Sequence, residues 1–75
     1  MVKVFKTNVD SVENVLALKQ NINLVYPYAK VSFDLDDVDN VLRVEDVTLN
    51  GEYIISQLNN AGYICIDLPI FDFGK

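Results

Sequence analysis

The chain has 75 residues, of which 51% are hydrophobic, and eleven acidic against six basic residues give it a net charge of −5. This length fits one domain, and the hydrophobic fraction is typical of a packed globule and excludes a disordered chain. The negative charge, with basic residues scattered rather than gathered in a stripe, argues against a nucleic acid partner and against binding to an anionic membrane surface.

The cysteine content indicates the redox state of the cellular compartment. The single cysteine, Cys65, cannot close an intramolecular disulfide, which favours a reducing, cytoplasmic environment. No apolar run approaches the roughly 18 residues of a membrane span, and the first ten residues lack the continuous apolar core of a signal peptide. We therefore expect neither membrane insertion nor export.

The first elements predicted along the chain are a strand and a helix. Residues 2–6 alternate as a strand, in which Phe5 is expected to point away from the core. Apolar residues then recur at helical spacing over residues 12–24. Asp10, three residues before Glu13, predicts a capping box at the start of this helix.

A hairpin follows the helix. Pro27 predicts a connection, because proline disfavours a helical residue before it and cannot donate to a strand ladder. Residues 31–35 and 41–45 alternate as two strands around an acidic turn, with Leu42 and Val44 toward the core. Together they form the predicted hairpin.

A second helix and a last strand complete the pattern. Asn50 is the expected N-cap of this helix, which should end close to Asn60 with Gly62 as its left-handed terminator. The last strand covers residues 63–68, with Ile64, Ile66 and Leu68 toward the core because Asp67 needs the other face, and Pro69 stops it. Each boundary thus carries its own local signal.

The order of these elements predicts one α+β domain over residues 1–68, followed by a C-terminal tail over 69–75. Two β-α-β halves with a central hairpin describe a ferredoxin-like βαββαβ sandwich. Right-handed crossovers then give a four-stranded antiparallel sheet in the order 4-1-3-2, with two helices on one face.

The step from the second helix into the last strand reads NNAGYICIDL. Its Ala61-Gly62-Tyr63, together with the order of the elements, resembles the heavy-metal-associated domains of copper chaperones over nearly the whole chain. The resemblance implies a ferredoxin-like fold with a metal loop between the first strand and the first helix. Those domains bind a soft metal there with Gly-Met-x-Cys-x-x-Cys.

The corresponding loop here, KTNVDSV from Lys6 to Val12, contains no cysteine, and the chain contains no histidine. Matching the helix phases places Asn8 and Ser11 at the two cysteine positions, whereas matching the strand phases places Val9 and Val12 there. In either register the thiolates that Cu(I) and Zn(II) select are replaced by an amide, a hydroxyl or methyl groups. We therefore expect no metal and no cofactor at this loop.

Two further uses of the loop are open. Lys6, Thr7, Asn8 and Ser11 could hold a small anion with the amide groups at the start of the helix. Alternatively, the polar residues only turn and cap the chain. Capping is favoured, because an anion would compete with Asp10 at the helix terminus.

Four acids lie close together in the expected hairpin, at Asp34, Asp36, Asp37 and Asp39. Clustered carboxylates of this kind bind hard cations such as Ca²⁺, but the spacing of a calcium loop is not met. Alternation along the strand also sends neighbouring carboxylates to opposite faces. A solvated hairpin tip that discourages edge pairing explains the cluster better.

The sequence offers no catalytic constellation. Cys65 has no histidine and no basic residue near it in sequence to lower its pKa. The serines likewise lack a histidine base, so that a serine triad cannot be assembled. No apolar pocket that would raise the pKa of a carboxyl can be named. We predict that the protein is not an enzyme.

The sheet face away from the helices, called the open face, is the remaining candidate site. Exposed contiguous aromatic residues usually mark a contact surface. Either the tail folds back over the domain, or tail and open face form a homodimer or partner interface, for example by strand addition at the exposed edge. The candidate interface residues are Phe5, Val41, Arg43, Tyr63 and Cys65 on the open face and Ile70, Phe71 and Phe73 in the tail.

These inferences give two functional hypotheses. The first is a non-catalytic protein-interaction domain that resembles a heavy-metal-associated domain and has lost metal binding. The alternative is a carrier of a small ligand or metal ion that uses the loop after the first strand or the acidic hairpin.

Overall fold

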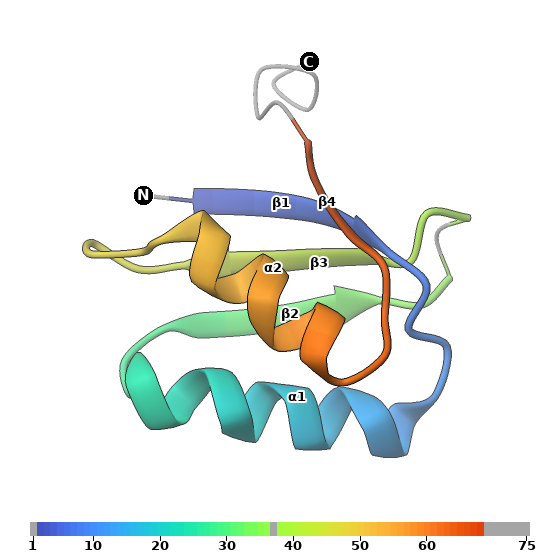
Figure 1. The fold of residues 1–75 in the computed structure, drawn as a ribbon, viewed down its shortest axis with the longest axis horizontal. Helices are drawn as coiled ribbons and strands as arrows, with labels where there is room; N and C mark the ends of the chain where they lie inside the picture. The colour runs from blue at the N-terminus through green and yellow to red at the C-terminus, as the bar shows by residue number, and fades with distance from the viewer. Residues whose placement is uncertain (1, 37, 69–75) are drawn as a thin grey trace.

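The computed structural model describes residues 2–36 and 38–68. These residues form β1 (Val2–Thr7), α1 (Val12–Val25), β2 (Lys30–Asp34), β3 (Val41–Glu45), α2 (Gly51–Asn60) and β4 (Cys65–Leu68). The strands make a four-stranded antiparallel sheet in the order β2-β3-β1-β4, and both helices lie on one side of it (Figure 1). This order is the predicted 4-1-3-2 counted from the other edge, so the ferredoxin-like α+β fold is confirmed.

Helix α1 begins differently from the prediction and ends close to it. Its N-cap is Ser11, whose side chain makes no capping hydrogen bond, so the capping box built on Asp10 is wrong. At the other end, the side-chain amide of Asn23 donates to the carbonyl oxygens of Tyr26 and Ala29, at 2.9 and 3.2 Å. Because these acceptors lie beyond the helix, Asn23 fixes the connection into β2.

Helix α2 confirms the predicted caps. The Asn50 side chain accepts a hydrogen bond from the Glu52 amide at 2.9 Å, which satisfies one of the free donors at the helix start. At its end, Gly62 has a φ of 92°, its amide donates to Asn59, and the Tyr63 amide donates to Leu58. This pair of bonds is a Schellman motif, which satisfies the last carbonyl groups.

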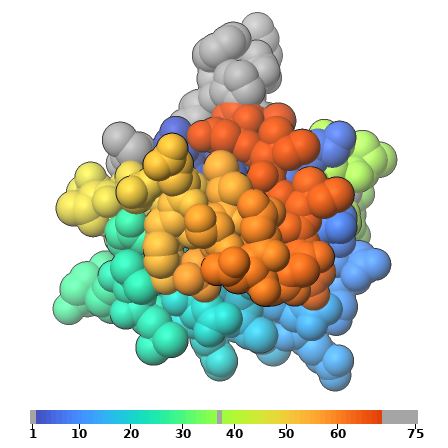
Figure 2. Space-filling model, in the orientation of Figure 1, coloured from blue at the N-terminus to red at the C-terminus, as the bar shows by residue number. Residues whose placement is uncertain are grey.

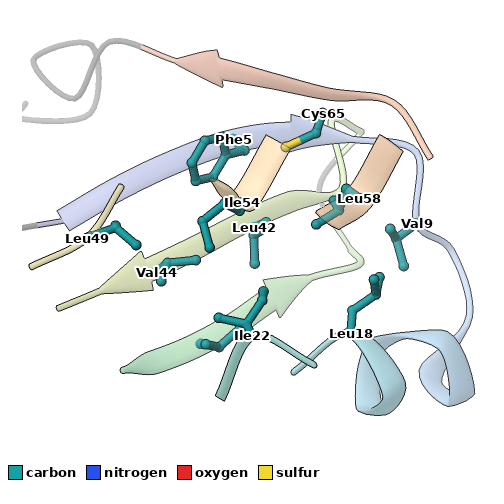
Figure 3. Close-up of a cluster of buried hydrophobic side chains, with 11 residues drawn as sticks. Phe5, Val9, Leu18, Ile22, Leu42, Val44, Leu49, Ile54, Leu58 and Cys65 are labelled. Atoms are coloured by element: carbon teal, nitrogen blue, oxygen red, sulfur yellow. The ribbon is translucent and has the colours of Figure 1, made fainter. Parts of the chain in front are cut away.

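The core fills the space between the helices and the sheet (Figure 3). Phe5 from β1 and Leu42 from β3 are fully buried, and they meet Ile22 of α1 with Ile54 and Leu58 of α2. The space-filling view shows α2 lying across the front of this layer, between α1 and the chain that leads into β4 (Figure 2). Burial of these large apolar groups is the main stabilising term of so small a domain.

The prediction was wrong about which faces of β1 and β4 point toward the helices. Phe5 is the register partner of Leu42, and cross-strand partners share a face, so Phe5 points into the core. Cys65, the partner of Thr7, does the same at 8% exposure. The expected inward isoleucines, Ile64 and Ile66, are instead 56% and 50% exposed.

A charged pair makes this arrangement possible. Turning Phe5 inward also turns Lys3 to the helical side, and turning Cys65 inward does the same to Asp67. The Lys3 ammonium lies 3.2 Å from the Asp67 carboxylate, and both side chains remain partly exposed. The two charges therefore satisfy each other beside the start of α2, and the core gains the ring of Phe5.

Candidate functional site

The loop after β1, where the sequence resemblance predicts the position of a metal loop, is tied to the hairpin between β2 and β3. The Thr7 amide donates to the Asp39 carbonyl oxygen at 3.1 Å, and the buried Thr7 hydroxyl donates to the Asn40 carbonyl oxygen at 2.6 Å. The same hydroxyl accepts a hydrogen bond from the Val9 amide at 3.2 Å. Thr7 thus holds the first turn of the loop from two sides.

The next two residues of the loop lie in different environments, Asn8 at the surface and Val9 in the core. The Asn8 side-chain oxygen accepts a hydrogen bond from the Ile64 amide at 2.8 Å, while Val9 is fully buried. Ser11 is partly exposed at the helix start, and Val12 is 67% exposed. Of the two registers predicted for the cysteine positions of heavy-metal-associated domains, the one with Asn8 and Ser11 places both positions at least partly at the surface.

Three of the four groups suggested for anion binding are engaged elsewhere. The Lys6 ammonium lies 3.5 Å from the Asp39 carboxylate, and the side chains of Thr7 and Asn8 make the bonds given above. Within residues 2–36 and 38–68, no three His, Cys, Asp or Glu side chains come together in a group that could hold a metal ion. Through the side chains of Thr7 and Asn8, the loop is joined to the hairpin and to the chain that enters β4.

The acidic hairpin uses part of its charge internally. The Asp34 carboxylate accepts a hydrogen bond from the Asp36 amide at 3.1 Å, which turns the chain after β2. Asp39 pairs with Lys6, and Asp37 lies outside the described residues. These contacts fit a solvated turn that is fastened to β1.

Cys65 is buried under α2, beside Leu58 and Phe5 (Figure 3). Burial, with a smaller contribution from the Asp67 carboxylate, raises the pKa of its thiol from 9.0 to about 12. The thiolate, which is the nucleophile and the metal ligand, is therefore scarcely populated at neutral pH.

The structure divides the predicted interface residues into three groups. Val41 and Arg43 lie on the open face, because they alternate with the inward Leu42 and Val44. Phe5 and Cys65 are core residues, and Tyr63 is partly buried against the core, so placing them on the open face was wrong. Ile70, Phe71 and Phe73 lie outside the described residues.

The register places other residues on the open face instead. One row across the sheet runs from Ser32 through Arg43 and Val4 to Leu68. A neighbouring pair, Lys6 and Ile66, joins β1 to β4. The open face thus consists, by alternation, of Val2, Val4, Lys6, Lys30, Ser32, Asp34, Val41, Arg43, Glu45, Ile66 and Leu68.

The two halves of the open face differ in character. The half over β2 and β3 carries charged and polar groups such as Lys30, Asp34 and Glu45. The half over β1 and β4 is mostly aliphatic; within it Val4 is buried at 4% exposure, whereas Ile66 is half exposed. The sequence contained one signal for the inward position of Phe5. Phe5 is the largest apolar residue of its strand and fills more core volume than Val4.

An open groove lies at the opposite end of the domain from the loop after β1. Its volume is about 460 Å³, and it runs between the connections α1–β2 and β3–α2. Tyr26, Tyr28 and Val47 line it; Tyr28 and Val47 are 92% and 86% exposed. The Tyr26 hydroxyl accepts a hydrogen bond from the Asn50 amide at 3.1 Å, which joins the two connections.

Comparison with known proteins bears on the fold. No protein-family model matches the sequence, and no curated protein matches it. A solved structure described as that of a gold binding protein has a TM-score of 0.74 with this chain, at 21% sequence identity, and the match covers 88% of this chain and 98% of the other. The chain therefore shares its ferredoxin-like fold with that gold binding protein.

No helix in the described residues is long and apolar enough to cross a membrane.

Proposed function

We propose that this protein is a non-catalytic protein-interaction domain, related to heavy-metal-associated domains, that has lost metal binding and uses its open face for contacts. The observation that carries the proposal is the aliphatic half of the open face, where Ile66 and the adjoining Ile64 are at least half exposed. Exposed apolar groups gathered on one surface are typical of contact sites.

The state of the loop after β1 supports the loss of metal binding. The position that corresponds to a cysteine, Asn8, now accepts a hydrogen bond from the chain entering β4. Thr7 and Lys6 are bound to the hairpin. A soft metal ion would find amide and hydroxyl groups there, and neither replaces a thiolate at useful affinity.

The chemistry of the lone thiol supports the absence of catalysis. Cys65 is buried and its pKa is raised to about 12, so it does not supply a nucleophile at neutral pH. The serines have no histidine to act as their base, because the chain contains none. A lone thiol without a disulfide partner also fits a reducing, cytoplasmic compartment.

The second candidate, a carrier of soft metal ions, is favoured by one observation. The structural neighbour is described as a gold binding protein, and its fold match extends over most of both chains. For this chain to carry such an ion, the ligands would have to come from outside the loop. Cys65 is the one thiol of the chain and is buried, which weighs against this candidate.

Metal titration separates the two candidates. Cu(I), Au(I), Zn²⁺ and Ca²⁺ are titrated against the native chain and against the double variant Asn8→Cys/Ser11→Cys, which restores two thiols at surface positions. We expect no stoichiometric binding by the native chain and a gain of Cu(I) binding by the variant. One equivalent of metal bound to the native chain at sub-micromolar concentration would overturn the proposal.

A further inference from the structure

We infer that two copies of this chain associate through antiparallel pairing of their β4 strands, centred on Ile66, so that two sheets become one. The inference rests on the proposed function, because it names a second copy of the chain as the partner of this interaction domain. It starts from the edge of the sheet. Strand β4 is the last strand beside β1, and no further described strand pairs with its outer side (Figure 1).

The two edges of the sheet carry different protection. Proteins commonly discourage edge pairing with charged side chains. The β2 edge follows this rule, because Lys30 and Asp34 are exposed on it. The β4 edge carries Ile66 and Leu68 on the open face, and the charge of Asp67 is already paired with Lys3 at 3.2 Å. Between residues 64 and 68 the open side of this edge carries no charge that would repel another strand.

The backbone of β4 shows which groups are free to pair. The Ile64 amide, just before β4, points toward the loop after β1, where it donates to Asn8, and the Thr7 amide points away from β4, toward Asp39. Backbone groups of successive strand residues point to opposite sides. Both observations therefore direct the amide and carbonyl groups of Cys65 and Asp67 toward the free edge.

Only one symmetric register uses these groups fully. If Ile66 faces Ile66 of the second copy, Cys65 faces Asp67 of that copy twice, and each pair exchanges two hydrogen bonds. Ile64 then faces Leu68 of the second copy on the open side. On the open side the pairing joins aliphatic groups to aliphatic groups, and it sets no like charges opposite each other on either side.

The two neighbouring registers are weaker. A centre on Asp67 would set two carboxylates opposite each other and would require an amide donor from Pro69, which has none. A centre on Cys65 would require the Tyr63 amide, which already donates to the Leu58 carbonyl oxygen at 2.9 Å. Registers whose centre lies between two residues would set backbone groups that point to the free edge opposite backbone groups that point toward β1. An antiparallel ladder excludes such pairs.

Cross-linking tests this register directly. In a Cys65→Ala background, Ile66→Cys is compared with Ile64→Cys and with Val38→Cys, a control at an exposed position in the turn between β2 and β3. The Cα atoms of a facing pair at residue 66 would lie about 4.5 Å apart, within disulfide range. Residues 64 of the two copies would lie about 13 Å apart along the strands, at roughly 3.3 Å per residue.

We expect mild oxidation to convert the Ile66→Cys variant into a covalent dimer at least tenfold faster than the other two. Light scattering should give the native chain a mass near twice 8.5 kDa at high concentration. The charged variant Ile66→Lys should lose that dimer and keep its fold by circular dichroism, whereas Val38→Lys should keep both. Equal cross-linking rates, or a native mass of 8.5 kDa at every concentration, would overturn the inference.

The outcomes that refute the proposed function differ from those that refute the β4 pairing. If the chain stays monomeric and binds no metal, the β4 pairing is refuted and an interaction domain for another protein still stands. If the native chain binds one equivalent of a soft metal, the proposed function is refuted whatever its mass.

Discussion

The side-chain oxygen of Asn8 lies 2.8 Å from the Ile64 amide nitrogen and accepts its hydrogen bond. Asn8, which the sequence comparison of helix phases set at a cysteine position of heavy-metal-associated domains, therefore joins the loop after β1 to the chain that enters β4. Replacing Asn8 by alanine should lower the free energy of unfolding by about 1 kcal/mol, because the Ile64 amide loses its partner.

Urea unfolding measures this effect, with Asn14→Ala as the control. Asn14 is exposed within α1, where alanine is the better helix former, so its replacement should leave stability unchanged or raise it by a few tenths of a kcal/mol. Equal stability of the Asn8→Ala variant and the native chain would show that the loop does not depend on this bond.

The buried hydroxyl of Thr7 should contribute more. It donates to the Asn40 carbonyl oxygen and accepts from the Val9 amide, and valine in its place fills the same volume without either bond. We expect Thr7→Val to cost about 1 to 3 kcal/mol, since both backbone groups lose their partner. Thr48→Val removes an exposed hydroxyl bond to Asp46 and should cost less than about 0.5 kcal/mol. Two variants of equal stability in thermal unfolding would contradict this account.

The assignment of faces in β1 and β4 can be tested by two truncations. Phe5→Ala removes a fully buried ring and should cost about 3 to 5 kcal/mol. Ile66→Ala shortens a half-exposed side chain on the open face and should cost about 1 kcal/mol or less. Denaturant midpoints measure the difference, and a chain that no longer unfolds cooperatively after Phe5→Ala agrees with it. A larger loss from Ile66→Ala than from Phe5→Ala would mean that the opposite faces point inward.

These two strands also show where the sequence was insufficient. In β1 both alternating sets contain apolar and basic residues, so the pattern alone did not choose between Val4 and Phe5. In β4 the isoleucines predicted the wrong face, because the carboxylate of Asp67 favours the solvent side. The ion pair with Lys3 lies between residues that are far apart in sequence, and only the folded chain reveals that it accommodates both charges on the helical side.

Local signals predicted the helix ends more reliably than alternation predicted which face of a strand points toward the core. The caps of α2 were predictable because Asn50, Gly62 and the helix between them act within a few residues. The order of the strands followed from the rules for β-α-β connections. The candidate site was harder, since Val4, Ile66 and Leu68 belong to the open face only through the register of three strands.

The two glycines at the ends of α2 should respond to alanine with opposite signs. Gly62 has a φ of 92°, a conformation that costs an alanine about 1 kcal/mol. Gly51 lies in the first turn, where an added Cβ would meet the flexible Lys3 side chain at 3.4 Å. Gly51→Ala should therefore raise stability by about 0.4 to 1 kcal/mol. Thermal unfolding of both variants decides this, and a stabilising Gly62→Ala would contradict the left-handed cap.

Cys65 should make the stability depend on pH in the alkaline range. Its pKa is about 12 in the fold against 9.0 for an ordinary thiol, so the unfolded chain releases the proton first as the pH rises. The stabilising contribution is complete below pH 9 and declines from there toward pH 12. The stability of the native chain relative to Cys65→Ala should thus fall by at most about 1.4 kcal/mol per pH unit.

Urea titrations at several alkaline pH values measure this difference, and the variant serves as the control for the ionisation of tyrosine and lysine. A difference that stays constant with pH would show that the thiol ionises equally in both states.

The central claim is that the chain works through its open face and its β4 edge, and that the loop after β1 carries no metal. Amide chemical shifts, recorded by NMR over a dilution series and then with one equivalent of Cu(I), test it most directly. The account predicts shifts that move with protein concentration over residues 64–68 and that stay fixed with Cu(I) over residues 7–12. Stoichiometric movement of the loop with Cu(I), with β4 unaffected by dilution, would contradict it.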